Sequence, residues 1–337
     1  MSRDLFLDGR SGGFGDVWMR LAGLHAAAAL RPDLRLRLFL APELAPLASK
    51  AFAGRIDFLP SGAIPPRSAR VYTNRGLKNL LPGLLRGVRY AAPLHRVVAG
   101  LKGRRDAGAR LNALLFTLLD LAGRATVAPA SENRCYFGRL ESAAIPELRS
   151  IPGEALLARI AADFDEVRRN LQAALPPAAE APGEEVLVFP SGKGHQYMPA
   201  GWAALHLPRA LFAFHEADGG AAQFEERGLR TARFARPEEI LLLARGRRRV
   251  VSTDSFPSHL LQYGCPDGTL GVVLTITRPE TVITPGFRGE VFASTAPCSP
   301  CPHRERGAFP LCAQALPACM TWEDAARSAR IAAFAQG

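Results

Sequence analysis

The first fifty residues alternate short apolar runs with an amphipathic stretch. Residues 5–7 form an apolar run that predicts a strand, and residues 34–40 alternate arginine with leucine before becoming apolar, as a second strand does. Between them, residues 17–30 place Leu21, Leu24 and several alanines on one face, which predicts a helix. This order of strand, turn, helix and strand predicts a parallel sheet with right-handed crossovers.

A second series of the same kind fills the C-terminal half. Further strands are expected at residues 186–189, 210–214, 249–252 and 270–276. Helical patterns occur at residues 111–121, 154–175, 237–244 and 259–263. A stretch rich in Pro, Ala and Glu, residues 175–185, is the best linker in the chain. We therefore expect two Rossmann-like α/β domains, an N-terminal one at residues 1–176 and a C-terminal one at residues 177–337.

Composition narrows the class of protein. Apolar residues make up 48% of the chain and charged residues 22%, the balance of a globular rather than a disordered protein. No uncharged run reaches the roughly 18 residues that a membrane span needs. The first residues lack a charged region followed by an apolar stretch, so we expect no secretory signal and a cytoplasmic location. In that compartment the six cysteines would be reduced thiols or metal ligands.

Positive charge is concentrated in one part of a basic chain. The formal net charge is +11, and residues 75–110 carry nine lysines and arginines against a single acid, Asp106. Interspersed leucines, glycines and prolines indicate a surface patch of loops and helices. Such a patch suits an anionic membrane face or an acidic acceptor, so Arg75 and Lys78 become candidate acceptor-binding residues. The alternative is a solvated face without a partner.

A glycine-rich turn, residues 9–15, connects the first strand and helix. Gly13 lets the backbone approach a ligand closely. Asp16 lies at the carboxyl edge of the expected parallel sheet, where ligands bind in open α/β folds. The alternative is that Asp16 is only the N-cap of the helix. The turn lacks the third glycine of the dinucleotide-binding fingerprint.

A small-residue loop follows the strand expected at residues 186–189. Ser191 and Lys193, with neighbouring glycines, suit a phosphate grip made of backbone N–H groups, a hydroxyl and an ammonium. The alternative is an ordinary exposed turn.

Asp254, Ser255 and His259 lie between the strand expected at residues 249–252 and a helix that opens near Pro257. The amino terminus of that helix would face a diphosphate with its partial positive charge. The alternative is that these residues only cap the helix.

Four cysteines gather near the carboxyl end of the chain. Thiolates at this spacing could hold a tetrahedral zinc or iron, and the alternative is a set of reduced structural thiols. They are Cys298, Cys301, Cys312 and Cys319. A separate D-x-D sequence at Asp163 and Asp165 matches metal-dependent transferases. The helical spacing around it makes Phe164 a core residue and predicts that both flanking acids face solvent.

Taken in order along the chain, these segments resemble glycosyltransferase family 9, the heptosyltransferases of lipopolysaccharide core assembly. Residues 13–16 resemble the family's small-x-Gly-Asp turn, and residues 190–193 resemble its lysine-bearing phosphate segment. Residues 251–255 with His259 are similar to the donor signature D-[ST]-G-x-x-H, although Phe256 replaces the glycine. The cysteine tail is also similar to the end of many members. The resemblance implies a GT-B fold, two Rossmann-like domains with parallel sheets facing a central cleft.

The resemblance also implies an activity and roles for these residues. It implies that a sugar, in the first place heptose, is transferred from an ADP-linked donor to a glycolipid or other glycan. The transfer would invert the anomeric centre and need no metal. Asp16 would be the general base and Glu216, just after the strand at residues 210–214, would orient the nucleoside. Asp254 belongs to the same donor-binding set, and the leaving diphosphate would be stabilised by Ser191, Lys193, Ser255 and His259. No cofactor is needed for catalysis, and the basic patch would contact the inner membrane face.

Two other functions stay open at this point. A basic chain with a metal-bound cysteine cluster could bind nucleic acid. Against it, aromatic residues are few near the basic segment and no RRM, KH or helix-turn-helix signature appears, so we expect no nucleic-acid partner. A GT-B scaffold without catalysis could instead bind only a glycolipid or a protein partner.

Overall fold

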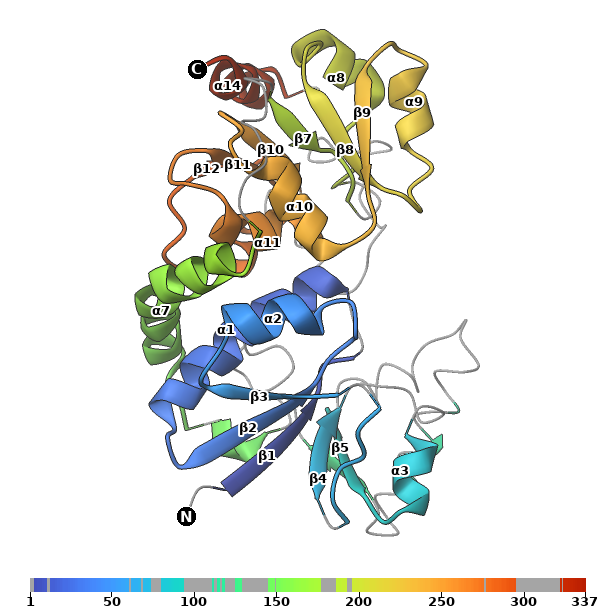
Figure 1. Ribbon diagram of the computed structural model, residues 1–337, viewed down its shortest axis with the longest axis vertical. Coiled ribbons are helices and arrows are strands. Elements are labelled where there is room, and N and C mark those ends of the chain that lie inside the picture. Colours follow the sequence, from blue (N-terminus) through green and yellow to red (C-terminus); the bar gives the residue numbers. More distant parts are fainter. Residues whose placement is uncertain are drawn as a thin grey trace. The chain divides into compact units, whose positions relative to one another are not determined.

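The computed structural model divides into two compact units, Met1–Asp163 and Phe164–Gly337 (Figure 1). Each unit is a layered α/β structure. The structure describes residues 3–10, 13–60, 62–67, 69–73, 80–93, 111, 114–115, 117–118, 125–128, 145–148, 150–176, 186–192, 196–275, 277–294, 322 and 324–337.

The described strands of the N-terminal unit form a six-stranded parallel sheet in the order β3-β2-β1-β4-β5-β6. They are β1 (Arg3–Asp8), β2 (Leu34–Phe39), β3 (Ile56–Leu59), β4 (Arg70–Thr73), β5 (Arg89–Pro93) and β6 (Ala125–Ala128). The strand order reverses between β1 and β4, as in a doubly wound Rossmann sheet. The accompanying helices are α1 (Phe14–Leu30), α2 (Ala45–Ala51), α3 (Leu81–Leu85) and the 3-10 helix η3 (Pro146–Leu148). Figure 1 shows α1 and α2 along one face of this sheet.

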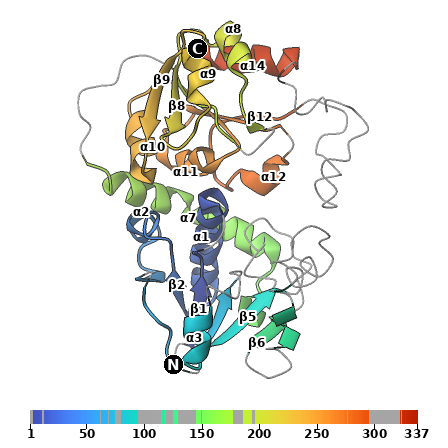
Figure 2. The same cartoon turned by 90° about the vertical axis from the view of Figure 1, so that its right-hand side faces the viewer.

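The C-terminal unit repeats this topology. Its described strands form a six-stranded parallel sheet in the order β12-β11-β10-β7-β8-β9, which reverses between β7 and β10 (Figure 1). They are β7 (Leu187–Phe189), β8 (Leu211–His215), β9 (Arg230–Phe234), β10 (Val250–Thr253), β11 (Leu270–Val273) and β12 (Glu290–Phe292). Figure 2 shows β8, β9 and β12 of this sheet from another side. The helices are α8 (Ala200–His206), α9 (Ala221–Glu225), α10 (Pro237–Ala244), α11 (Phe256–Gly264), α12 (Pro279–Val282) and α14 (Ala325–Gln336), and α7 (Gly153–Ala173) precedes them.

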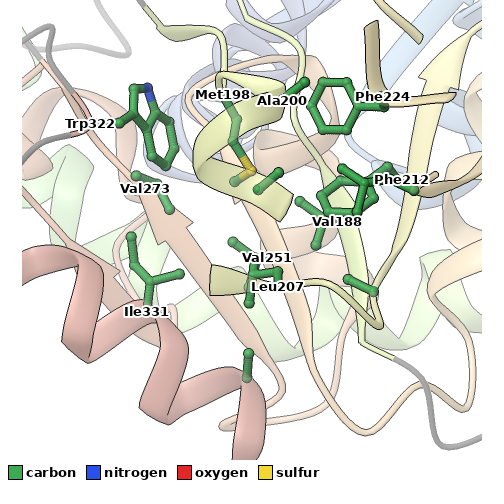
Figure 3. Packing of buried hydrophobic residues seen from close by; sticks show 14 of the residues in the cluster. Val188, Met198, Ala200, Leu207, Phe212, Phe224, Val251, Val273, Trp322 and Ile331 are labelled. Carbon is green, nitrogen blue, oxygen red and sulfur yellow. The ribbon is translucent and has the colours of Figure 1, made fainter. Parts of the chain in front are cut away.

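One face of the C-terminal sheet carries a large apolar core (Figure 3). Val188, Phe212, Val251 and Val273 project from four neighbouring strands and are almost completely buried. Alternate residues of a strand point to the same face, so these side chains form one continuous surface. Residues of α8, α9 and α14 cover it, among them Phe224 of α9, whose ring lies 4.9 Å from that of Phe212.

The elements expected from apolar periodicity are confirmed with shifts at their ends, except that most of the helix expected at residues 111–121 lies outside the described residues. Strands occur at all six expected positions, and α7, α10 and α11 fall on expected helical stretches. The helix expected from residue 17 is α1, which already begins at Phe14. Strands β3 to β6, β9 and β12 were not expected, because their sequences carry weak apolar alternation. Within the described part of the chain, no helix combines the length and apolar character that crossing a bilayer requires.

The basic segment is not simply a surface patch of loops and helices. Residues 89–93 form β5, an inner strand of the N-terminal sheet, with Tyr90 and Ala91 buried. The run of arginines concealed this strand because Arg89 marks its exposed start. The compact units divide within α7. The expected boundary after residue 176 stays a prediction, because residues 177–185 of the linker lie outside the described residues.

The D-x-D sequence requires one correction. Phe164 is buried in α7 as expected, and Asp165 is exposed. Asp163, however, is buried, and its carboxylate pairs with Arg55 Nη1 at 2.5 Å and Arg159 Nη2 at 2.5 Å. A buried carboxylate is stable when cations and hydrogen bonds compensate its lost hydration. Asp163 is therefore a structural ion-pair residue of the N-terminal unit.

The core predicts a large penalty for truncation at Phe224. Phe224→Ala should lower the free energy of unfolding of the C-terminal unit by about 3–5 kcal/mol, since it removes a fully buried ring among Phe212, Phe214 and Tyr197. Urea unfolding followed by the fluorescence of Trp202 and Trp322 measures the change. Leu205→Ala, at an exposed site of α8, should shift stability by less than about 0.5 kcal/mol. Equal effects of the two changes would contradict this packing.

Candidate functional site

The C-terminal sheet gathers polar groups where its strand order reverses. The carboxyl ends of β7 and β10 lie side by side there, and open α/β sheets bind ligands at this point. The hydroxyl Oγ1 of Thr253, the last residue of β10, donates to the carbonyl oxygen of Ser191 at 2.9 Å. This bond joins the turn after β7 to the turn after β10, so both sequence-predicted segments belong to one site.

Asp254 is the centre of that site. Its side chain is buried, and its Oδ2 accepts hydrogen bonds from Gln196 Nε2 at 2.5 Å and Thr277 Oγ1 at 2.5 Å. His259 Nε2 lies 3.5 Å from the other carboxylate oxygen, Oδ1. A buried carboxylate needs such partners to offset its desolvation. The carboxylate thereby joins the segment after β7, the start of α11 and the segment after β11.

The turn after β7 folds back on itself to bring Gln196 to Asp254. The N–H of Met198 donates to the carbonyl oxygen of Pro190 at 2.9 Å and closes the turn. Gly192 permits this closure because a Cβ at that position would lie 2.6 Å from Gln196 Cβ, closer than real contacts allow. The small residues of this loop therefore have a packing role that is independent of any ligand.

The start of α11 combines capping with site residues. Ser255 is the N-cap, and its N–H donates to Ser258 Oγ at 3.3 Å. Capping is thus confirmed for Ser255, and its role in a donor site stays a prediction. The side chains of Asp254 and His259 contact each other, so neither residue is only a helix cap. Pro257 fits the first turn, where its missing N–H costs little. The helix amino terminus adds partial positive charge at this edge of the sheet.

Asp218, after β8, is a site residue that the sequence reasoning missed. Its carboxylate accepts from the Ser191 hydroxyl and, at 2.8 Å, from the N–H of Gly220. Glu216, the acid that was expected to matter, is exposed two residues earlier. One signal was available, since acids at the end of the second strand of a Rossmann sheet bind ribose hydroxyls. Both acids satisfy that rule, and the structure connects only Asp218 to the Ser191 turn.

Tyr197 borders the same turn. Burial and, to a smaller extent, the negative charge of the Asp218 carboxylate raise the pKa of its hydroxyl to about 12, while the Arg233 guanidinium acts in the opposite direction. The phenol therefore stays neutral at physiological pH. It contributes a hydroxyl next to Asp218 without adding a second negative charge.

The N-terminal unit presents its own polar turn at the reversal point between β1 and β4. Gly13 is the N-cap residue of α1, with an extended backbone at φ −68° and ψ 147°. Asp16 lies in the first helical turn and is exposed, so the N-cap alternative for Asp16 is wrong. A carboxylate in the first turn interacts favourably with the helix dipole. Its exposure leaves Asp16 accessible to a ligand.

An ion pair at the end of β1 was also missed. The Asp8 carboxylate is completely buried and binds Arg10 Nε and Nη2, both at 2.9 Å. The hydrogen bonds that the Arg10 guanidinium donates to Asp8 raise the pKa of Arg10, and the guanidinium lies 4.9 Å from the centre of the Phe39 ring. This pair holds Arg10 next to the glycine turn. The available signal was an acid at the end of an apolar strand, followed by glycine and arginine.

Several sequence-predicted residues lie outside the described residues, and their roles stay predictions. They are Arg75, Lys78, Lys193 and the four cysteines Cys298, Cys301, Cys312 and Cys319.

No protein-family model and no curated protein sequence matches the chain. Solved structures do match it. The family 9 glycosyltransferase from Veillonella parvula is 12% identical over 86% of this chain and 87% of that chain, with a TM-score of 0.50. The chain has a GT-B fold. The resemblance to family 9 is therefore confirmed at the level of the fold, as the repeated Rossmann topology also indicates.

Two E. coli heptosyltransferases also match this GT-B chain. WaaC with ADP is 13% identical over 86% of this chain and 92% of that chain, with a TM-score of 0.48. Heptosyltransferase II is 13% identical over 86% and 90%, with a TM-score of 0.45. Identities this low leave function to be argued from the residues of the site.

The Asp254 network predicts that the Thr277 hydroxyl stabilises the C-terminal unit. Thr277→Val keeps the side-chain shape but removes a donor from a buried carboxylate, which should lower the free energy of unfolding by about 1–3 kcal/mol. Thr277→Ser retains the hydroxyl and should lose less. Denaturant unfolding compares the three proteins. If Thr277→Val were as stable as the parent, the hydrogen bond would not support the site.

Proposed function

We propose that the chain is an inverting, metal-independent glycosyltransferase. It moves a sugar, with heptose the first choice, from an ADP-linked donor to an acidic glycolipid or other glycan. The observation that carries the proposal is the Asp254 network at the reversal point of the C-terminal sheet, which joins the Ser191 turn to the amino end of α11. The GT-B fold supports glycosyl transfer, and the matched WaaC structure holds ADP.

The donor diphosphate would bind between the Ser191 turn and α11. Backbone N–H groups and hydroxyls at Ser191 and Ser255, with the helix dipole, favour a dianionic group there. Lys193 would add an ammonium. The Asp254 carboxylate would repel a diphosphate, and it already accepts two short hydrogen bonds. Its role would therefore be to orient His259 and the loop. The His259 imidazole would then contact the diphosphate.

The nucleoside would extend toward the end of β8. Two acids follow this strand, and Asp218 already accepts a hydrogen bond from Ser191. Glu216 is exposed and so remains available to accept hydrogen bonds from ribose or adenine. In this arrangement Asp218 fixes the phosphate turn while Glu216 contacts the ligand.

Transfer would proceed by a single displacement with Asp16 as general base. The Asp16 carboxylate accepts the proton of the acceptor hydroxyl as that oxygen bonds to the anomeric carbon. The bond from that carbon to the diphosphate oxygen breaks, and its electron pair leaves with ADP. The site stabilises this negative charge through α11, Lys193 and His259. Attack on the face opposite the leaving group inverts the anomeric centre.

The acceptor would be anionic and held by the N-terminal unit. Gly13 allows close approach beside Asp16, and Arg75 and Lys78 would bind acidic groups. The basic charge of residues 75–110 supports peripheral contact with the anionic inner membrane face, on the cytoplasmic side where we expect the protein to act.

The proposal predicts a strict need for the Asp16 carboxylate. Asp16→Asn should bind ADP as the parent does but release ADP from ADP-heptose at least about 100-fold more slowly with an anionic glycolipid acceptor, because the amide cannot accept the proton. Glu43→Gln, at another exposed acid of this unit, should leave the rate unchanged. Turnover of Asp16→Asn at the parental rate would remove Asp16 from the base role. If the parent protein itself releases no ADP when the acceptor is added, the result would favour a scaffold without catalysis.

The proposal also predicts that chelation leaves transfer intact. EDTA should not change the initial rate, because helix and side-chain charges stabilise the leaving diphosphate without a cation. Parallel assays with EDTA and with added Mg²⁺ measure this. A rate that EDTA abolishes and Mg²⁺ restores would contradict metal independence.

A further inference from the structure

Exposed leucines gather in the basic part of the N-terminal unit. Among the described residues, eight large apolar side chains are exposed, and five of them lie in residues 81–118. They are Leu81, Leu85, Leu111, Leu114 and Leu118. Single exposed leucines are ordinary, but a concentration of them marks an interaction surface.

Two of these leucines stand on α3, whose inner side is already filled. Leu80 and Val88 are buried in a core cluster with Tyr90 of β5, and Leu84 packs against that cluster. Gly83 lies so close to Tyr90 that a Cβ would be 2.0 Å from its hydroxyl oxygen. This close contact holds the backbone of α3 against Tyr90 of the sheet.

The outer side of α3 is apolar and flanked by cations. Leu81 is 53% exposed and Leu85 is 80% exposed, and their spacing of four residues places them on one helix face. Pro82 is exposed beside Leu81, and the exposed arginines Arg86 and Arg89 follow the helix. We call residues 80–89 the α3 hook.

The backbone of the α3 hook is hydrogen-bonded within itself. The N–H groups of Gly83 and Leu84 both donate to the carbonyl oxygen of Leu80 at 3.0 Å. The N–H groups of Arg86 and Val88 both donate to the carbonyl oxygen of Gly83, also at 3.0 Å. A segment that enters a region of low water content must satisfy its backbone groups internally. The α3 hook meets this requirement through the hydrogen bonds within residues 80–88.

A second set of leucines continues the pattern. Leu111, Leu114 and Leu118 have helical backbone conformation and are each more than half exposed. Spacings of three and four residues place them on one face of a helix. They follow directly on the segment with nine basic residues and one acid.

We infer that the α3 hook docks on an anionic bilayer surface. Its leucines enter the boundary between headgroups and acyl chains, and Arg86 and Arg89 bind lipid phosphates. Charge complementarity favours this partner, since the chain carries a net charge of +11 and the sequence segment that contains the hook, residues 75–110, has nine basic residues and one acid. A nucleic acid would match the arginines but would leave the leucines in water. This inference deepens the membrane contact of the proposed function by naming the element that makes it.

Vesicle flotation of the full chain tests the inference without an enzymatic assay. The parent should float with vesicles of phosphatidylglycerol and phosphatidylethanolamine, and not with vesicles of phosphatidylcholine. Leu81→Ser with Leu85→Ser should weaken binding by on the order of tenfold per leucine. Arg86→Gln and Arg89→Gln should weaken it about fivefold each. Leu205→Ser, at a leucine 76% exposed in the other unit, is the matched control and should bind as the parent does.

Two results would overturn the inference. One is a folded parent that does not bind the anionic vesicles. The other is a leucine double variant, with parental circular dichroism and melting temperature, that binds them as tightly as the parent. The test separates the two proposals. Membrane binding without glycosyl transfer contradicts the proposed reaction but not the hook, whereas transfer to a soluble acceptor without membrane binding contradicts the hook and the membrane contact but not the reaction.

Discussion

The candidate site depends on one buried carboxylate, that of Asp254. Desolvation of an isolated carboxylate is costly, so the fold must supply hydrogen-bond donors for it. Gln196 and Thr277 supply them from segments that follow β7 and β11. Satisfying this one group therefore fixes the position of the Ser191 turn, of the start of α11 and of His259. The geometry that we propose for diphosphate binding is a consequence of that requirement.

The two units have the same sheet topology but place an aspartate in two different environments at the reversal point. Each sheet reverses its strand order beside its first strand, and each brings a small-residue turn and a helix amino terminus to that point. In the N-terminal unit the turn leaves the carboxylate of Asp16 exposed, which suits a general base. In the C-terminal unit the carboxylate of Asp254 is buried and held, which suits an orienting role. Burial, and not residue type, distinguishes the roles that we propose for the two aspartates.

Local pattern was enough to predict the fold class and part of the site. Apolar strands flanked by turns are visible in the sequence, so Ser191, Asp254 and Ser255 were found as polar residues that follow them. The partners were not visible because they come from distant segments. Thr277 reaches Asp254 across 23 residues, and Asp163 was misjudged because its partner Arg55 lies 108 residues away. Strand β9 has two arginines in five residues, and strand β5 begins with an arginine and ends with a proline, so neither strand has an apolar pattern clear enough to predict.

The central proposal is that the C-terminal sheet binds a nucleoside diphosphate at the point where its strand order reverses. A thermal-shift panel of ADP, UDP, GDP, CMP and NAD on the full chain tests it most directly. A ligand that binds only the folded state at 100 times its dissociation constant adds about 2.7 kcal/mol to the stability of that state. We predict that ADP raises the melting temperature by several degrees and that the other nucleotides raise it less. A melting temperature that none of the nucleotides changes would contradict the account.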